Sequence, residues 1–257
     1  MDFSYSLVSL RSLALDMDYF LVPWDTEIMG RRVAEIKKIA VHDSEQAQIQ
    51  FETFENWLKS ENIDFCSCRI GHDLIVETDF IQKHNFKFIE LNYRPQINNL
   101  QLLDLSNEMV EIQLAAPADK EHLADMAKSI FKYGRFHQDI ALGDEIGNDR
   151  YKTWMVNAFS LPFQSVYKCI ISTKIAGFFV VEATEKKCHW ALTGLAPGLN
   201  GRGMGTRVWK SMMHFHQAQG VESITTSISS HNTAVLNLYA KLNFRFPTPA
   251  ATFHWHR

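Results

Sequence analysis

The sequence is poor in cysteine, with four among 257 residues. So few cysteines exclude the class of small secreted proteins that depend on a disulfide scaffold. Cys66 and Cys68 alternate in the β-like run FCSCRI, which places them on one face of a strand, and no second close pair completes a zinc site. We therefore expect buried free thiols.

The histidines do not form a clear metal-binding pattern either. His214 and His216 are two residues apart in a helical run, so their side chains diverge. His254 and His256 are two apart in a terminal strand, so they share one face. Neither pair by itself predicts a metal site, and we expect no bound metal.

Three further features are missing from the chain. A net charge of −3 excludes the basic excess of a general nucleic-acid binder. No apolar run approaches the ~20 residues of a membrane span. The N-terminal stretch has no basic region and carries Asp16 and Asp18, unlike a signal peptide. With 46% hydrophobic residues, the sequence predicts a globular cytoplasmic protein that binds neither nucleic acid nor membrane.

The most informative stretch of the sequence runs from residue 190 to residue 217. It consists of an apolar segment (WALTGLAP), a glycine-dense corner (GLNGRGMG) and a helical run (TRVWKSMMHFHQAQ). The four glycines of the corner, Gly198, Gly201, Gly203 and Gly205, lack a Cβ, so the chain can take positive φ and its amides can approach an anion. A helix that begins near residue 205 or 206 would direct its first N–H groups at the same place. This pattern predicts a phosphate cradle between a strand and a helix.

Spacing distinguishes among the known phosphate-binding loops. A P-loop requires Lys and then Ser or Thr after its last glycine, but Gly205 is followed by Thr206 and Arg207. A dinucleotide-binding loop that starts at Gly201 and Gly203 would require a third glycine where Thr206 stands. The spacing excludes a P-loop and argues against a dinucleotide-binding loop, and a plain turn between strand and helix remains the simple alternative.

The corner resembles the acyl-CoA loop of the GNAT superfamily of N-acyltransferases, which has Gln or Arg, two residues, Gly, one residue, and Gly or Ala. Asn200, Gly203 and Gly205 occupy those places, with Asn200 departing from Gln or Arg, and Pro197 upstream also agrees. The resemblance implies an α/β fold with a mixed central sheet and flanking helices, and acetyl-CoA as the acyl donor. It implies cofactor contacts from a splayed strand, the loop and the following helices, at Thr193, Gly194, Leu195, Asn200, Gly201, Arg202, Gly203, Met204, Gly205, Thr206 and Asn232.

The chain is long enough for two small domains, and a short repeat supports this organisation. The string QKHNFKF at 82–88 matches AKLNFRF at 240–246, so that Asn85 corresponds to Asn243 with a shift of 243 − 85 = 158 residues. Each copy would end a helix and open a strand. We therefore expect a small N-terminal α/β unit at 1–107 that is a decayed half-copy, and a GNAT domain at 108–257.

Periodicity and capping residues predict the individual elements. The predicted strands are 33–39, 64–70, 86–92, 109–115, 165–172, 175–183, 187–195, 223–229 and a terminal strand that reaches His256 and Arg257. The predicted helices are 44–60 with Ser44 as its cap, 73–84, 119–131, one that carries Arg150, Tyr151 and Trp154, and 232–242. Residues 100–107 are expected to connect the two units, and a long polar loop to precede the helix with Tyr151.

Two side chains are expected on one face of the last helix. Asn232 and Tyr239 are seven residues apart, close to two turns, and Asn232 stands where a cap is favoured. Transfer of an acetyl group to an amine requires a proton for the departing thiolate, and a phenol of pKa about 10 can supply one to a thiol of pKa about 8.5. In the resembled superfamily a Tyr at this position is the general acid, and an Asn early in the helix contacts the cofactor. His137 or Asp139 would be the base, with Glu182 or water as alternatives.

Several longer strings narrow the resemblance. WDTEIMG, RFHQD, DRYKTWMVN, HNTAVLNLY and ATFHWHR together are similar to the GNAT enzymes that acetylate dTDP-fucosamine, a dTDP-linked 4-amino-4,6-dideoxy sugar. This resemblance implies a small-molecule amine acceptor that is contacted by Arg135, Phe136, His137, Asp139 and Tyr151, in a protein that could act as a homodimer. Two other interpretations stay open: a protein or peptide N-acetyltransferase, and a non-catalytic acyl-CoA-binding module.

Overall fold

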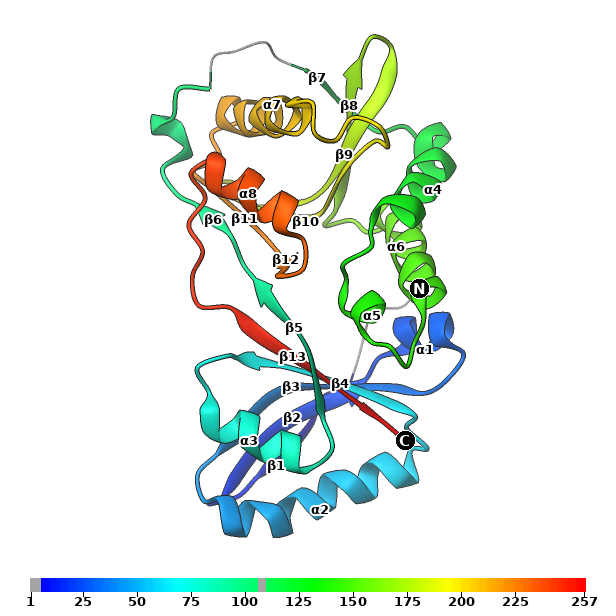
Figure 1. Cartoon of the computed structure of the whole chain (residues 1–257), viewed down its shortest axis with the longest axis vertical. Helices are drawn as coiled ribbons and strands as arrows, with labels where there is room; N and C mark the ends of the chain where they lie inside the picture. Colours follow the sequence, from blue (N-terminus) through cyan, green and yellow to red (C-terminus); the bar gives the residue numbers. More distant parts are fainter. Residues whose placement is uncertain (1–5, 106–109) are drawn as a thin grey trace. The chain divides into compact units, whose positions relative to one another are not determined.

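Two units of strands and helices make up the computed structural model, which describes residues 6–105 and 110–257 (Figure 1). Unit 1 contains Met1–Asn92, Arg135–Ile146 and Thr248–Arg257, and unit 2 contains Tyr93–Gly134 and Gly147–Pro247. Each unit is therefore discontinuous in sequence. The expected boundary between residues 107 and 108 lies outside the described residues, and the division into domains 1–107 and 108–257 stays a prediction.

Unit 1 is a mixed sheet with helices. Its strands are β1 (Val8–Arg11), β2 (Leu15–Leu21), β3 (Val33–Val41), β4 (Phe65–Gly71), β5 (Lys87–Tyr93) and β13 (Ala250–His256), in the order β1-β2-β3-β4-β13-β5. Its helices are α1 (Pro23–Met29), α2 (Ser44–Ser60), α3 (Ile75–Lys83) and α5 (Arg135–Gln138). Only β3 and β4 pair in parallel among these strands, and the last strand of the chain lies in the sheet interior.

Unit 2 has a second mixed sheet. Its strands are β6 (Gln96–Ile97), β7 (Glu111–Leu114), β8 (Ser165–Ile171), β9 (Lys174–Ala183), β10 (Lys187–Leu195), β11 (Ser223–Thr226) and β12 (Ile228–Ser229). Six of them form a sheet in the order β6-β11-β10-β9-β8-β7, in which β10 and β11 are parallel. The helices are α4 (Lys120–Ile130), α6 (Asp144–Ala158), α7 (Met204–Ala218) and α8 (Thr233–Lys241), with short 3-10 turns η1 (Leu100–Leu102) and η2 (Pro117–Asp119). The expected α/β class with a mixed sheet is confirmed.

The observed elements correct several sequence-based details. Helix α2 has the predicted bounds, but its cap is Asp43 rather than Ser44, because the Asp43 carboxylate accepts hydrogen bonds from the amides of Glu45 and Gln46. The strand expected at 223–229 is divided into β11 and β12. Strands β1 and β2 and helix α1 were not predicted. Residue Met109, the expected start of β7, lies outside the described residues.

The repeat in the sequence has a structural counterpart. Adding 158 to the bounds of α3, 75 and 83, gives 233 and 241, which are the bounds of α8. The two helices end with equivalent hydrogen bonds, from the Phe86 amide to the Ile81 carbonyl and from the Phe244 amide to the Tyr239 carbonyl. Asn85 and Asn243 both take left-handed backbone angles, with φ of 65° and 64°. The half-copy interpretation is supported by this match.

Parallel pairing also matches between the two units. In unit 1, Val33 to Ile36 lie opposite Phe65 to Cys68, and in unit 2, Lys187 to Trp190 lie opposite Ser223 to Thr226. Each parallel register thus contains four residue pairs. One structural plan is present twice in the chain.

Apolar periodicity explains how the helices cover these sheets. The buried residues of α2 are Ala47, Phe51, Phe54 and Leu58, a spacing of three and four that forms one stripe. In unit 2, one core cluster contains Trp190, Trp209 and Phe244 from the side of α7 and α8, and a second contains Phe178, Leu192 and helix residues from α4 and α6. The two faces of the unit 2 sheet are therefore both covered.

The four cysteines are buried and unpaired, as predicted. Burial raises the pKa of the Cys169 and Cys188 thiols to about 12, so these thiols stay protonated and unreactive at neutral pH. Across the ranges that the structure describes, no helix combines the length and hydrophobicity of a membrane span.

Strand β13 provides a direct test of the unit 1 fold. Phe253 is 1% exposed and packs in the cluster that contains Phe51, Phe54 and Phe80. We expect Phe253→Ala to lower the free energy of unfolding by about 3–5 kcal/mol, since it leaves a cavity in the core. Urea denaturation followed by circular dichroism measures the change, with Phe163→Ala, at a side chain that is 56% exposed, as the control. Equal effects of the two substitutions would contradict the central position of β13.

Candidate functional site

The two parallel strands of unit 2 separate after a short pairing. The register of β10 with β11 ends at Trp190 and Thr226, whereas β10 continues to Leu195 and remains paired with β9 on its other edge. A β-bulge between Trp190 and Leu192 marks the separation. The edge of β10 from Ala191 onward is thus outside the register with β11. Free edge groups of this kind pair readily with an extended ligand.

Gly194 lies in the separated part of β10. A Cβ on Gly194 would overlap the side chains of Ile130 and Phe178, so only glycine fits here without displacement of the neighbours. The β-bulge of this strand lies at Ala191, before Gly194. Gly194 therefore allows β10 to pack closely against α4 and β9.

Three of the four corner glycines use their conformational freedom. Gly198, Gly201 and Gly203 have φ of 82°, 75° and 73°, and among the described residues nothing lies within 4 Å of the position of a Cβ. Gly205 has no positive φ, and a Cβ there would only touch Leu238 at 3.5 Å. The corner is exposed from Gly201 to Gly203. An anion from solvent can reach its backbone amides.

Helix α7 begins at the end of this corner. Its first residue is Met204, one residue before the predicted start. The cap position is occupied by Gly203, which has no side chain that could accept a hydrogen bond from the first amides of the helix. The corresponding helix in unit 1, α2, is capped by the carboxylate of Asp43. The amides at the start of α7 are therefore available to an anion, whereas an acidic side chain already accepts from those of α2.

Tyr239 lies where β10 and β11 separate. The side chain is 1% exposed, and its hydroxyl accepts a hydrogen bond of 3.1 Å from the Trp209 indole N–H. The hydroxyls of Thr193 and Thr226, from the two separating strands, also bond to it. Burial raises the pKa of Tyr239, so the phenol keeps its proton at neutral pH. In unit 1 the corresponding position is Ile81, which has no proton to give.

Asn232 caps α8, as the sequence predicted. Its side-chain oxygen accepts from the Val235 amide at 3.3 Å. The side chain is only partly buried, so its amide nitrogen can still donate to a ligand. Asn232 thus caps α8, and Tyr239 lies within the helix seven residues later.

His189 is a polar residue of β10 that the sequence analysis missed. It precedes Trp190 by one residue in β10, and its Nδ1 lies 3.0 Å from the Thr225 hydroxyl in β11. Glu182 lies directly opposite in β9 and accepts from Gln164 at 2.7 Å. Burial lowers the pKa of His189, which leaves the imidazole neutral at pH 7. The alternation in KCHWALTGL could have shown that His189 points away from the face of Trp190.

The residues expected to contact an acceptor do not form one group within a unit. Arg135, Phe136, His137 and Asp139 belong to unit 1, and Tyr151 belongs to unit 2. Phe136 is buried in a cluster with Phe65, and His137 is partly buried. These positions leave the acceptor contacts as a prediction.

Arg135 takes part in an ion-pair network of unit 1. Its guanidinium lies 3.1 Å from the Ser67 hydroxyl, 3.3 Å from the Asp25 carboxylate and 3.6 Å from the Glu35 carboxylate. Asp25 is almost fully buried, so it requires such a partner. Arg135 therefore stabilises the fold of unit 1 whatever else it contacts.

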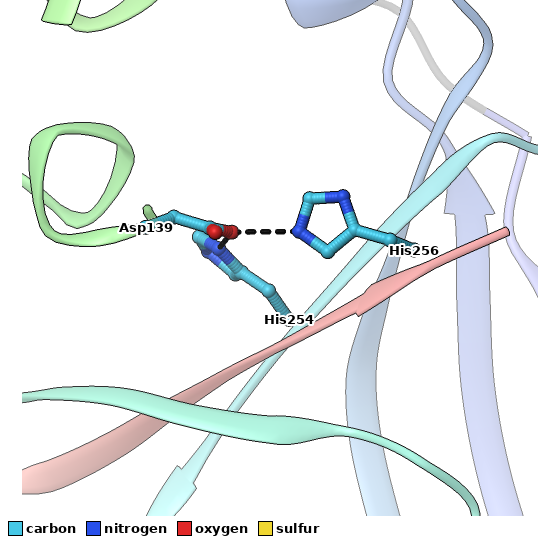
Figure 2. A group of neighbouring side chains, drawn as sticks. All are labelled: Asp139, His254 and His256. Atoms are coloured by element: carbon cyan, nitrogen blue, oxygen red, sulfur yellow. Dashed lines mark hydrogen bonds and ion pairs between the residues drawn. The ribbon is translucent and has the colours of Figure 1, made fainter. Parts of the chain in front are cut away.

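Asp139 is bound to two histidines of the last strand. His254 Nδ1 and His256 Nε2 lie 2.7 and 2.8 Å from the same carboxylate oxygen (Figure 2). Burial alone would raise the pKa of Asp139, but these hydrogen bonds and that from the Ala141 amide lower it well below its usual value. A carboxylate with such a low pKa is a weak proton acceptor, which argues against the role of base expected for Asp139.

Tyr151 stacks between two aromatic rings of unit 2. Its ring centroid lies 4.3 Å from that of Phe131 and 6.3 Å from that of Trp154, with interplanar angles of 22° and 9°. The ring also lies against Gly134, where a Cβ would overlap it. This stack fixes the orientation of the phenol.

Comparison with known proteins identifies the fold. Residues 140–244 match the model of the acetyltransferase (GNAT) family. A GCN5-related N-acetyltransferase from Sphaerobacter thermophilus is 11% identical and has a TM-score of 0.66 over 96% of this chain and 82% of that chain. A tandem GNAT protein from the clavulanic acid biosynthesis pathway is 10% identical, with a TM-score of 0.62 over 95% and 83% of the two chains. The chain has the α/β GNAT fold with two mixed sheets, and its solved neighbours include a tandem GNAT protein.

A distant curated relative was also found. The spore coat polysaccharide biosynthesis protein SpsD of Bacillus subtilis (strain 168) is 19% identical over 223 residues, which are 86% of this chain and 76% of that protein.

Proposed function

Because the chain has the GNAT fold and residues 140–244 match the acetyltransferase (GNAT) family, we propose that it is an acetyl-CoA-dependent N-acetyltransferase. Its acceptor is the amino group of a dTDP-linked 4-amino-4,6-dideoxyhexose. One observation carries the proposal: the uncapped start of α7 and the hydroxyl of Tyr239 both border the separated strand β10. An anion-binding helix start and a proton donor would therefore lie beside the same strand.

The glycine corner would bind the pyrophosphate of the donor. The amides from Gly201 to Thr206 and the dipole of α7 stabilise negative charge here, and the side chain of Arg202 adds a positive charge. Two phosphate charges at a helix start contribute about 1 to 4 kcal/mol, whereas micromolar affinity requires about 8 kcal/mol. The remainder would come from the free edge of β10 at Thr193, Gly194 and Leu195, bonded to the pantetheine amides, and from Asn232.

Tyr239 would protonate the leaving group. In the reaction the neutral amine forms a bond to the thioester carbonyl carbon, and the C–S bond then breaks. Tyr239 gives its proton to the departing thiolate, and its buried bonds with Trp209 and Thr193 hold the hydroxyl in place. His189, neutral at pH 7, accepts the proton that the amine loses, directly or through water.

Two observations support a sugar-nucleotide acceptor. The strings RFHQD and DRYKTWMVN are similar to those of dTDP-4-amino-4,6-dideoxy sugar acetyltransferases. The relative SpsD is also named a spore coat polysaccharide biosynthesis protein. Under this proposal Arg135, Phe136, His137 and Tyr151 contact the acceptor.

The acceptor class is tested by release of CoA thiol from acetyl-CoA. We expect turnover with a dTDP-linked 4-amino-4,6-dideoxyhexose and little with the free amino sugar or with lysine-containing peptides. Preference for peptides would favour a protein N-acetyltransferase. Tight acetyl-CoA binding without thiol release from any amine would instead favour a non-catalytic acyl-CoA-binding module.

The two units should differ in donor binding. We expect one acetyl-CoA per chain by calorimetry, since Asp43 already caps the helix of unit 1 and Gly203 leaves that of unit 2 open. Gly203→Asp places a carboxylate at the equivalent position and should weaken acetyl-CoA binding about tenfold or more. Gly203→Asn is the matched control, because Asn tolerates the same backbone angle without charge. Two bound molecules per chain, or equal affinities of these variants, would contradict the assignment.

Tyr239→Phe should lower kcat by roughly 10² to 10⁴, because the thiolate then leaves without a proton donor. The dissociation constant for acetyl-CoA should stay within about twofold, which places the defect in the chemical step. Steady-state assays and calorimetry on the same preparation give both values. Tyr167→Phe in β8 is the control, and an unaltered kcat in Tyr239→Phe would exclude the phenol as general acid.

The activity should depend on the protonation of His189. Burial lowers the pKa of His189, so the neutral form that accepts a proton predominates at pH 7, and kcat/KM should fall as the pH drops through that pKa. His189→Gln should remove this acid limb and lower kcat at pH 7 by about 10²-fold. His122→Gln, at an exposed position of α4, is the control. An acid limb that persists in His189→Gln would assign it to another group.

A further inference from the structure

Unit 1 contains a second cluster of chemically versatile side chains. His254 and His256 project from the same face of β13, and Asp139 comes from the segment that follows α5 (Figure 2). One ligand atom from each of the three side chains lies within 4.8 Å of the others. Asp139 and His254 are buried, and His256 is 23% exposed. These residues take no part in the proposed acetyl transfer.

We propose that Asp139, His254 and His256 bind a divalent transition-metal ion, with Zn²⁺ as the natural occupant. His254 Nδ1, His256 Nε2 and one Asp139 oxygen are the three ligands, and a water molecule completes a tetrahedral site. Two imidazoles and a carboxylate form a donor set that suits zinc better than the hard cations Mg²⁺ and Ca²⁺. The site is independent of the glycine corner in unit 2.

The observed distances require only a small adjustment. Metal–ligand bonds of about 2.0–2.2 Å in tetrahedral geometry separate neighbouring ligand atoms by about 3.3 Å. The Asp139 oxygen now lies 2.7 and 2.8 Å from the two nitrogens, so it must move away by roughly half an ångström. Asp139 stands in a loop outside the sheet, which allows such a shift more easily than a strand position would.

The orientation of the two imidazoles is also compatible with metal binding, because His254 Nδ1 and His256 Nε2 both face the Asp139 carboxylate. A metal would bind through the lone pairs of these two nitrogens, and each ring would carry its proton on its other nitrogen. For His254 that other nitrogen, Nε2, is buried and has no hydrogen-bond partner within the described part of the chain.

The surroundings limit access to one side. The Phe65 ring lies 4.7 Å from the His254 ring and 5.1 Å from the His256 ring, and Phe136 lies 5.9 Å from His254. These apolar walls exclude bulk water from the buried ligands, while the exposed part of His256 gives the ion a route from solvent. The positive charge of nearby Arg135 is balanced by Asp25 and Glu35. The metal would join the segment of Asp139 to the C-terminal strand.

Metal binding by the full-length chain tests this inference. The protein is freed of metal with a chelator and titrated with Zn²⁺ by calorimetry and with Co²⁺ by visible absorption. We expect one ion per chain, a tetrahedral Co²⁺ spectrum, and a rise in Tm of about 5 °C at saturating Zn²⁺. Asp139→Asn and His256→Gln should lose the ion, and His214→Gln, at an exposed position of α7, should keep it.

His256→Gln is the decisive variant, because its partly exposed side chain makes a folding defect less severe than at His254. Absence of stoichiometric binding in the native chain, or unchanged binding in both ligand variants, would overturn the proposal. If Asp139→Asn is less stable but the native chain binds no metal, the proposal is also overturned. The cluster would then be a set of hydrogen bonds between Asp139 and the two histidines. Acetyl-CoA affinity, measured on the same variants, reports on unit 2 and should be unaltered, so the two proposals fail separately.

Discussion

The separation of β10 from β11 is the constraint on which the candidate site depends. Parallel pairing ends at Trp190 and Thr226, and the bulge that follows turns β10 away from its neighbour. Backbone N–H and C=O groups on a free strand edge require partners. An extended ligand with its own amides satisfies them, and the hydroxyl of Tyr239 lies at the point where the strands separate. The geometry of the backbone therefore underlies both the proposed position of the pantetheine arm and the proposed role of Tyr239 beside it.

Unit 1 follows the same plan but lacks the features that are proposed to bind acetyl-CoA in unit 2. Its parallel strands also pair over four residues, and its helix α3 ends as α8 does. However, Asp43 stands at the cap of α2, Ile81 replaces the phenol, and only two residues separate β3 from α2. A carboxylate at the helix start repels a phosphate, and an isoleucine donates no proton. The repeat is preserved in backbone structure, whereas the glycine corner and the phenol of Tyr239 are present in unit 2 alone.

Local patterns made the glycine corner and α8 predictable from sequence. The positive φ of Gly201 and Gly203 follows from their residue type, and the capping role of Asn232 follows from its place before an apolar stripe. Both depend on neighbours within a few residues. The bulge at Ala191 was not predicted, because no glycine marks it and strand registers depend on the pairing of whole strands.

Contacts between distant segments were not predictable in the same way. Asp139 meets His254 and His256 across 115 and 117 positions of the sequence, and Arg135 meets Asp25 across 110. The contacts of Asp139 exist because β13 pairs between β4 and β5, which no local periodicity indicates. His189 was missed for a related reason, since its partners Glu182 and Thr225 come from two neighbouring strands. Sequence reasoning predicted the backbone of the glycine corner well and the networks of charged and polar side chains poorly.

The charged network of unit 1 changes what the motif RFHQD can be expected to do. Arg135 balances the buried Asp25, Phe136 fills a core, and Asp139 binds two imidazoles. Substitution of any of these residues would leave a buried charge or a cavity, so a loss of activity alone could not distinguish acceptor binding from folding. His137 and Tyr151 are only partly buried. Within the proposed acceptor set, these two side chains therefore give the cleanest information about substrate recognition.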